Sequence, residues 1–73
     1  MNYGLRDTDW AISSKGNHWR RINGKMVSAG RKKDGNYWAM ADGIFADGTF
    51  YTINEAMAAA EARLQYLIRS RGF

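Results

Sequence analysis

Four Asx-Gly dipeptides lie close together in this chain, and they constrain its fold more than any other feature. They are Asn23-Gly24, Asp34-Gly35, Asp42-Gly43 and Asp47-Gly48. Because Gly and Asn tolerate positive φ, such pairs are typical of tight turns between antiparallel strands. Short β-prone runs separate them, at residues 18–22, 25–31, 37–41, 44–46 and 49–51. The pattern predicts an antiparallel β-meander of three to four strands, with Asp42-Gly43 as either a turn or a bulge inside one longer strand over residues 37–46.

The first of these turns also predicts a register. A two-residue turn at Asn23-Gly24 places Ile22 opposite Lys25, and the pairing then continues outward along both strands. A turn at Asp47-Gly48 would in the same way pair Phe45 with Phe50, which makes these two rings the predicted aromatic core of the sheet. The register of the first hairpin puts Arg20, Ile22, Lys25 and Val27 on one face, and Trp19, Arg21 and Met26 on the other.

The C-terminal third of the chain predicts one amphipathic helix. Thr52-Ile53-Asn54-Glu55 is a capping box, in which the Thr hydroxyl and the Glu carboxylate bond to free N–H groups of the first turn. Acidic residues lie early and arginines late, as the helix dipole favours, and Gly72 is a plausible end. Apolar residues recur at helical spacing, namely Ile53, Met57, Ala60, Leu64, Leu67 and Ile68. The predicted fold class is therefore α+β: a meander in residues 18–73 packed against one C-terminal helix, after a partly ordered extension over residues 1–17.

Composition argues against catalysis and against bound cofactors. The chain of 73 residues has no Cys and one His, His18, so we expect no disulfide, no metal site and no cofactor. Turn geometry accounts for Asp34, Asp42 and Asp47, and no Gly-rich phosphate loop opens a helix. We expect a protein that is not an enzyme. No apolar run is long enough to cross a membrane and no signal peptide is evident, so the expected compartment is the cytoplasm.

Charge is divided unevenly along the chain. Residues 1–33 hold eight basic and two acidic side chains, residues 34–62 hold five acidic and none basic, and three arginines follow. A basic segment of this kind suits a phosphate backbone, and aromatic side chains near it could pack on sugars or bases. The alternatives are that Trp38 is a core residue and that residues 31–33 are a solvated hairpin tip. The candidate binding residues are Arg20, Arg21, Lys25, Arg31, Lys32, Lys33 and Trp38.

Two further segments carry a family resemblance. Gly35-Asn36-Tyr37-Trp38-Ala39, and then Gly48-Thr49-Phe50-Tyr51-Thr52-Ile53-Asn54-Glu55-Ala56 with Ala59-Ala60, resemble DNA-binding domains of the ethylene-response-factor type. They are also similar to the arm-binding domains of phage tyrosine integrases. The resemblance spans residues 18–64 and implies a three-stranded sheet backed by one helix, in which the sheet enters the major groove of duplex DNA through Arg and Trp side chains. This chain departs from the family in having Asp42 and Asp47 where basic or polar strand residues are expected.

A second hypothesis belongs to another functional class. Small strand-and-helix proteins rich in aromatic residues also resemble the inhibitors that phages direct against host complexes, including anti-CRISPR proteins. Surplus Trp and Tyr would then serve as anchors on a protein partner, and an exposed edge strand would permit strand addition or a homodimer. Salt separates the hypotheses, because phosphate contacts weaken steeply as ionic strength rises, whereas apolar docking does not.

Overall fold

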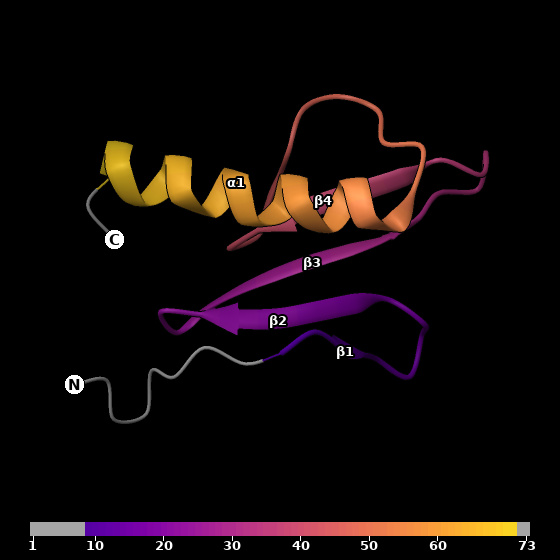
Figure 1. Ribbon diagram of the computed structural model, residues 1–73, viewed down its shortest axis with the longest axis horizontal. Coiled ribbons are helices and arrows are strands. Elements are labelled where there is room, and N and C mark those ends of the chain that lie inside the picture. Colours follow the sequence, from indigo (N-terminus) through magenta and orange to yellow (C-terminus); the bar gives the residue numbers. More distant parts are fainter. Residues whose placement is uncertain (1–8, 72–73) are drawn as a thin grey trace.

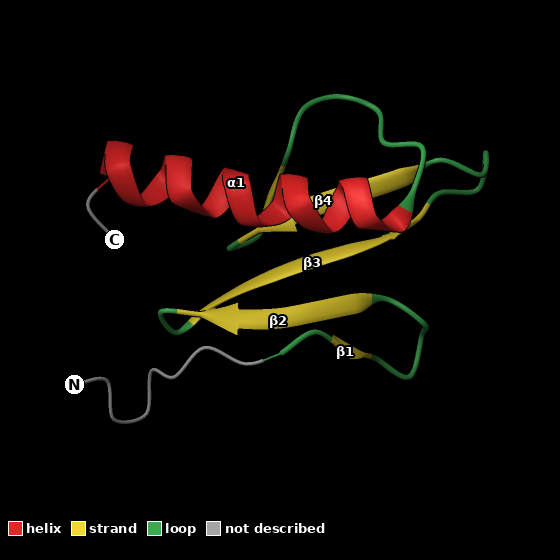
Figure 2. Ribbon diagram, in the orientation of Figure 1, coloured by secondary structure: helices red, strands yellow, loops and turns green. Residues whose placement is uncertain are grey.

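The computed structural model describes residues 9–71, and within them the chain forms one antiparallel sheet and one helix. The predicted helix end at Gly72 and the first part of the predicted N-terminal extension lie outside these residues. The five strands follow one another in space in chain order, as a meander with no crossover (Figures 1 and 2). They are β1 (Ala11–Ile12), β2 (His18–Ile22), β3 (Lys25–Arg31), β4 (Tyr37–Ala41) and β5 (Ile44–Phe45), and they precede α1 (Ile53–Arg71).

The α+β prediction is confirmed, but the sheet has more strands than the three to four predicted. The additional strand is β1, which lies in the segment predicted as an extension and pairs with the start of β2. A tight turn joins them, where the Ser13 N–H donates to the Asn17 carbonyl at 2.8 Å and the Gly16 N–H donates to the Ser13 carbonyl at 2.9 Å. Two residues are too few for a visible alternation of polar and apolar side chains, which is why the sequence did not predict β1.

The turn predictions are confirmed at two hairpins. Asn23 and Gly24 both have positive φ, and Ile22 pairs with Lys25 in the predicted register. Asp42 and Gly43 have positive φ as well, and Ala41 pairs with Ile44 across them. Two consecutive positive φ values define the turn whose twist matches that of the flanking strands. Asp42-Gly43 is therefore a true turn between β4 and β5, not a bulge.

The predicted pairing of Phe45 with Phe50 is wrong. Phe45 pairs with Met40 on β4, and its side chain is 59 % exposed. Phe50 forms an isolated bridge with Tyr37 and packs against the core from the helix side of the sheet. Because the turn at Asp42-Gly43 already pairs β5 with β4, the segment after Asp47 does not fold back on β5 and meets β4 again only at the Phe50–Tyr37 bridge.

The helix begins as predicted. The Glu55 N–H donates to the Thr52 hydroxyl at 3.1 Å, and the Thr52 N–H donates to the Glu55 carboxylate at 3.1 Å. The same carboxylate accepts the Tyr51 N–H at 2.9 Å, so three backbone donors at this end are satisfied by two side chains. These bonds stabilise the sharp change from loop to helix.

The core lies between α1 and one face of β3 and β4. Its sheet side is Val27, Ala29, Ala39 and Ala41, and its helix side is Ala56, Ala60, Leu64 and Leu67; all are buried. Because most of these side chains are methyl groups, the helix can approach the strands closely, and Figure 1 shows it lying across β4 and β3. No helix within residues 9–71 is long and apolar enough to cross a membrane.

Candidate binding surface

The strand register divides the sheet into two unlike faces. The face that α1 covers carries the core alanines and Val27, together with Arg20 and Ile22 from β2. The one helix among residues 9–71 packs on that side and does not cover the opposite face. We call it the open face; it consists of Ala11, Trp19, Arg21, Met26, Ser28, Gly30, Trp38, Met40 and Phe45.

The position of Trp38 on the open face depends on Gly30, which has no side chain. It pairs with Gly30, and a Cβ atom added to Gly30 would overlap Cζ2 of the indole. The same Cβ would lie 2.6 Å from Oδ1 of Asn17. Glycine at this position therefore allows the ring to lie directly on the β3 backbone. Trp38 is half-buried there and does not belong to the core beneath the helix.

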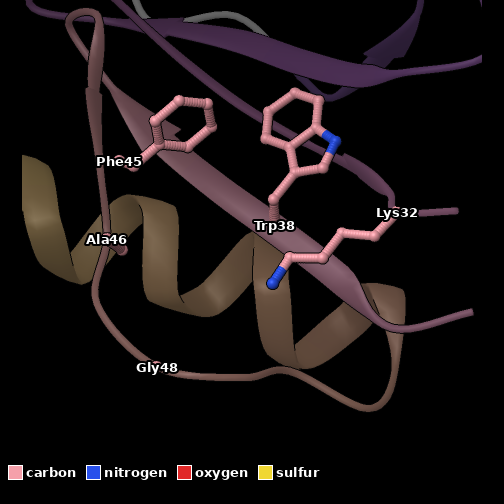
Figure 3. A pocket seen from close by; sticks show the side chains of 5 residues that line it. All are labelled: Lys32, Trp38, Phe45, Ala46 and Gly48. Atoms are coloured by element: carbon pink, nitrogen blue, oxygen red, sulfur yellow. The ribbon is translucent and has the colours of Figure 1, made fainter. Parts of the chain in front are cut away.

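A pocket opens between Trp38 and the start of the β5–α1 loop. It is lined by Lys32, Trp38, Phe45, Ala46 and Gly48, and its volume is about 360 Å³. The rings of Trp38 and Phe45 meet edge to face, with centroids 5.9 Å apart and planes at 85°. Figure 3 shows both rings on the same side of β4, with the Lys32 side chain running past the base of the Trp38 side chain. The pocket thus combines two perpendicular aromatic walls with one cation.

The predicted basic residues at the β3–β4 connection form an exposed tip beside this pocket. We call Arg31, Lys32 and Lys33 the basic tip; all three are exposed. The backbone under it is held by the Lys32 N–H, which donates to the Asn36 carbonyl at 2.7 Å, and by the Asp34 carboxylate, which accepts the Asn36 N–H at 2.9 Å. Lys32 is the member that reaches the pocket.

The other three predicted basic residues do not gather at one place. Arg21 is exposed on the open face. Arg20 lies on the helix side, where its Nη1 donates to Oε2 of Glu61 at 2.6 Å and its guanidinium lies 6.0 Å from the centre of the Trp10 ring. Lys25 is half-buried at the start of β3, on the same side as Arg20. Arg21 pairs with Met26 beside the Asn23-Gly24 turn, whereas Trp38 pairs with Gly30 near the opposite end of β3. The structure therefore places the basic tip and Trp38 at one end of the sheet, and Arg20, Arg21 and Lys25 toward the other end.

Sequence reasoning missed Phe45 as a site residue. Its assignment to the core rested on the wrong turn, and the signal that could have corrected it is Asp42-Gly43. A turn at that dipeptide pairs Met40 with Phe45 and so puts the ring on the same face as Trp38.

Within residues 9–71, no three His, Cys, Asp or Glu side chains come close enough together to hold a metal ion. Comparisons with protein-family models, with curated proteins and with solved structures found no match to this chain.

Proposed function

We propose that this protein is a small non-enzymatic module that binds nucleic acid through the open face and the basic tip, and that it acts in the cytoplasm. The observation that carries the proposal is the lining of the pocket, where a cation of the tip meets two aromatic rings of the open face. Cationic side chains bind the phosphates of a nucleic acid, and aromatic rings bind its bases or sugars. A surface that offers both within one site has the two kinds of group this ligand requires.

The charge of the surrounding chain supports the same partner. Between Asp9 and Asp34 there is no acidic residue, while the segment contains Lys15, Arg20, Arg21, Lys25, Arg31, Lys32 and Lys33. Of these, Arg21 is exposed on the open face, and Lys32 and Lys33 are exposed in the turn beside the pocket. Arg31 is also exposed, but it pairs with Tyr37 on the helix side of the sheet. Such a concentration of positive charge attracts a polyanion over a distance of roughly 10 Å at moderate ionic strength.

The packing of α1 on one face of the sheet also favours the opposite face as the binding surface. The buried residues of α1, Ala56, Ala60, Leu64 and Leu67, are used to hold the sheet. A partner that meets the protein through the opposite face would leave this packing undisturbed. The resemblance to sheet-based DNA-binding domains leads to the same surface.

Charge reversal of the basic tip tests this proposal. The variant R31E/K32E/K33E should bind a labelled oligonucleotide at least about tenfold more weakly than the parent chain at low salt, because three phosphate contacts become repulsive. Lys33→Glu and Arg69→Glu form a matched pair of single reversals, since both residues are exposed but Arg69 lies on α1. Equal effects of the two single reversals would show that only net charge matters and would contradict a site at the tip.

A second function is favoured by one observation, the exposure of large apolar side chains on the open face. Met26 is 47 % exposed and Phe45 59 % exposed. Such groups are typical anchors in protein interfaces, so the face also suits an inhibitor that docks on a host protein complex, as the phage-type hypothesis holds. Titration of the protein into a purified CRISPR effector complex tests this reading, with target-DNA binding by the complex as the readout. Inhibition that persists at high salt and is lost in Met26→Asp would favour it over nucleic-acid binding.

A homodimer through an edge strand stays a prediction. The outer strands β1 and β5 have two residues each, so a paired copy would gain few backbone hydrogen bonds. Short edge strands of this kind are one way in which proteins limit edge-to-edge pairing.

A further inference from the structure

We infer that the pocket formed by Lys32, Trp38 and Phe45 receives one unpaired base, so that the ligand of this protein is single-stranded nucleic acid. The inference rests on the proposed function and makes it more specific, since the family resemblance alone implies duplex DNA. Three properties of the pocket carry it: the size and shape of its walls, the rigidity of one ring, and the distribution of charge on its rim.

The walls fit a flat ring of limited size. A volume of about 360 Å³ lies near the lower end of the range for small-molecule sites, roughly 300–1,000 Å³. Because the two rings stand at 85° to each other, a planar group can lie parallel to only one of them. Phe45 is 59 % exposed and offers the free ring face, whereas Trp38 forms the side wall that the edge of the base would meet.

One wall of the pocket is already ordered before a ligand arrives. The indole of Trp38 lies against Gly30 and the Asn17 side chain, and Phe45 contacts it from the other direction. A ring that is fixed by its neighbours loses little conformational freedom when a base packs against it, and this favours affinity.

The charges around the pocket would orient a bound nucleic-acid strand. Lys32 lines one side of the pocket, and Lys33 follows it in the same exposed turn. Arg31 ends β3 directly before Lys32 and pairs with Tyr37 on the helix side. On the other side Asp47 is exposed between the lining residues Ala46 and Gly48. A phosphate is attracted to the first side and repelled from the second, so we expect the backbone to run along the basic tip while the base points toward Phe45.

The composition of the open face favours unpaired bases over a base-paired groove. Reading a groove requires side chains that donate and accept hydrogen bonds to base edges, above all Arg, Asn and Gln. Among the strand residues of the open face, only Arg21 and Ser28 are polar, and the remaining side chains are aromatic, methionine, alanine or absent. The one amide beside them, that of Asn17, is packed over Gly30. Aromatic rings stack on bases of any sequence, but only where the bases are free of their partners.

The experiment compares two probes of equal length, a labelled single-stranded oligothymidine and a labelled mixed-sequence duplex, by fluorescence anisotropy at low salt. We expect the parent chain to bind the single strand more tightly. Phe45→Ala should weaken single-strand binding by about 5- to 150-fold, the measured range for loss of one stacked base. Phe45→Trp should retain binding, and Tyr66→Ala, which removes an exposed aromatic side chain of α1 outside the open face and the basic tip, should change it less than about twofold.

The possible results distinguish a failure of the proposed function from a failure of the single-strand inference. Binding of neither probe at low salt would overturn the proposed function, and the inference with it. Equal or tighter binding of the duplex, or an unchanged single-strand affinity in Phe45→Ala, would overturn the inference alone. Because Phe45 is largely exposed, the variant should remain folded, and its thermal unfolding curve checks that a loss of affinity is not a loss of structure.

Discussion

At the scale of single residues, the open face depends on a glycine more than on any aromatic side chain. Gly30 has no backbone conformation that requires glycine, and its importance lies in the space that a side chain would fill. The indole of Trp38 and the amide of Asn17 occupy that space together. Since Phe45 in turn contacts Trp38, the shape of the pocket depends on Gly30 having no Cβ atom.

We therefore predict that Gly30→Ala disturbs both stability and the pocket. The added methyl group forces the Trp38 ring away from β3, which should lower the free energy of unfolding by about 1–3 kcal/mol. Urea unfolding followed by Trp fluorescence measures the change. Ser28→Ala is the control, because Ser28 lies on the same strand and face and already has a Cβ atom. A Gly30→Ala protein as stable as the parent would mean that Trp38 does not pack on this strand.

Two basic residues of the predicted site allow a second test at this scale. Lys32 lines the pocket, whereas Arg20 is bonded to Glu61 on the opposite side of the sheet. Lys32→Gln and Arg20→Gln remove the same charge, and we expect the first to weaken single-strand binding more than the second. For Arg20→Gln we expect instead a small loss of stability, below about 1 kcal/mol, because the ion pair is partly exposed to solvent. Anisotropy and urea unfolding on both variants measure the two effects, and a reversed order of affinities would place the binding site on the helix side.

At the scale of elements, much of the fold could be predicted because its signals are local. The register around Asn23-Gly24 follows from a two-residue turn, and the start of α1 follows from Thr52 and Glu55. What could not be predicted depends on contacts between segments. The sequence around Asp42 to Gly48 contains two turn dipeptides, and only the pairing of β5 with β4 decides that Phe45 faces outward. The pocket combines that residue with Lys32 and Trp38, so the missed pairing hid the site as well.

The cap of α1 gives a prediction at the same scale. Thr52→Ala removes the hydroxyl that accepts the Glu55 N–H, and we expect it to lower the free energy of unfolding by about 1 kcal/mol. Circular dichroism during thermal unfolding measures this effect. Asn54→Ala, an exposed substitution in the first turn of the same helix, should have a much smaller one. Equal stability of Thr52→Ala and the parent chain would contradict the capping geometry.

At the scale of the whole molecule, α1 packs on one face of the sheet, and we propose that the other face binds the partner. Small buried residues let α1 pack closely on β3 and β4, and this leaves the other side of the sheet for aromatic side chains and cations. The basic segment and the acidic segment of the chain meet at the pocket, where Lys32 lies on one side and Asp47 on another. We propose that a surface with this arrangement attracts a phosphate backbone and also orients it.

The salt dependence of binding tests the central claim most directly. If Arg21, Arg31, Lys32 and Lys33 contact four phosphates of a single strand, the logarithm of the association constant should fall with the logarithm of salt concentration at a slope of about −3. Affinity for a labelled oligothymidine would then drop about 50-fold between about 50 mM and about 200 mM salt. A slope near zero would contradict nucleic-acid binding through this surface, because no phosphate contacts would then contribute to the affinity.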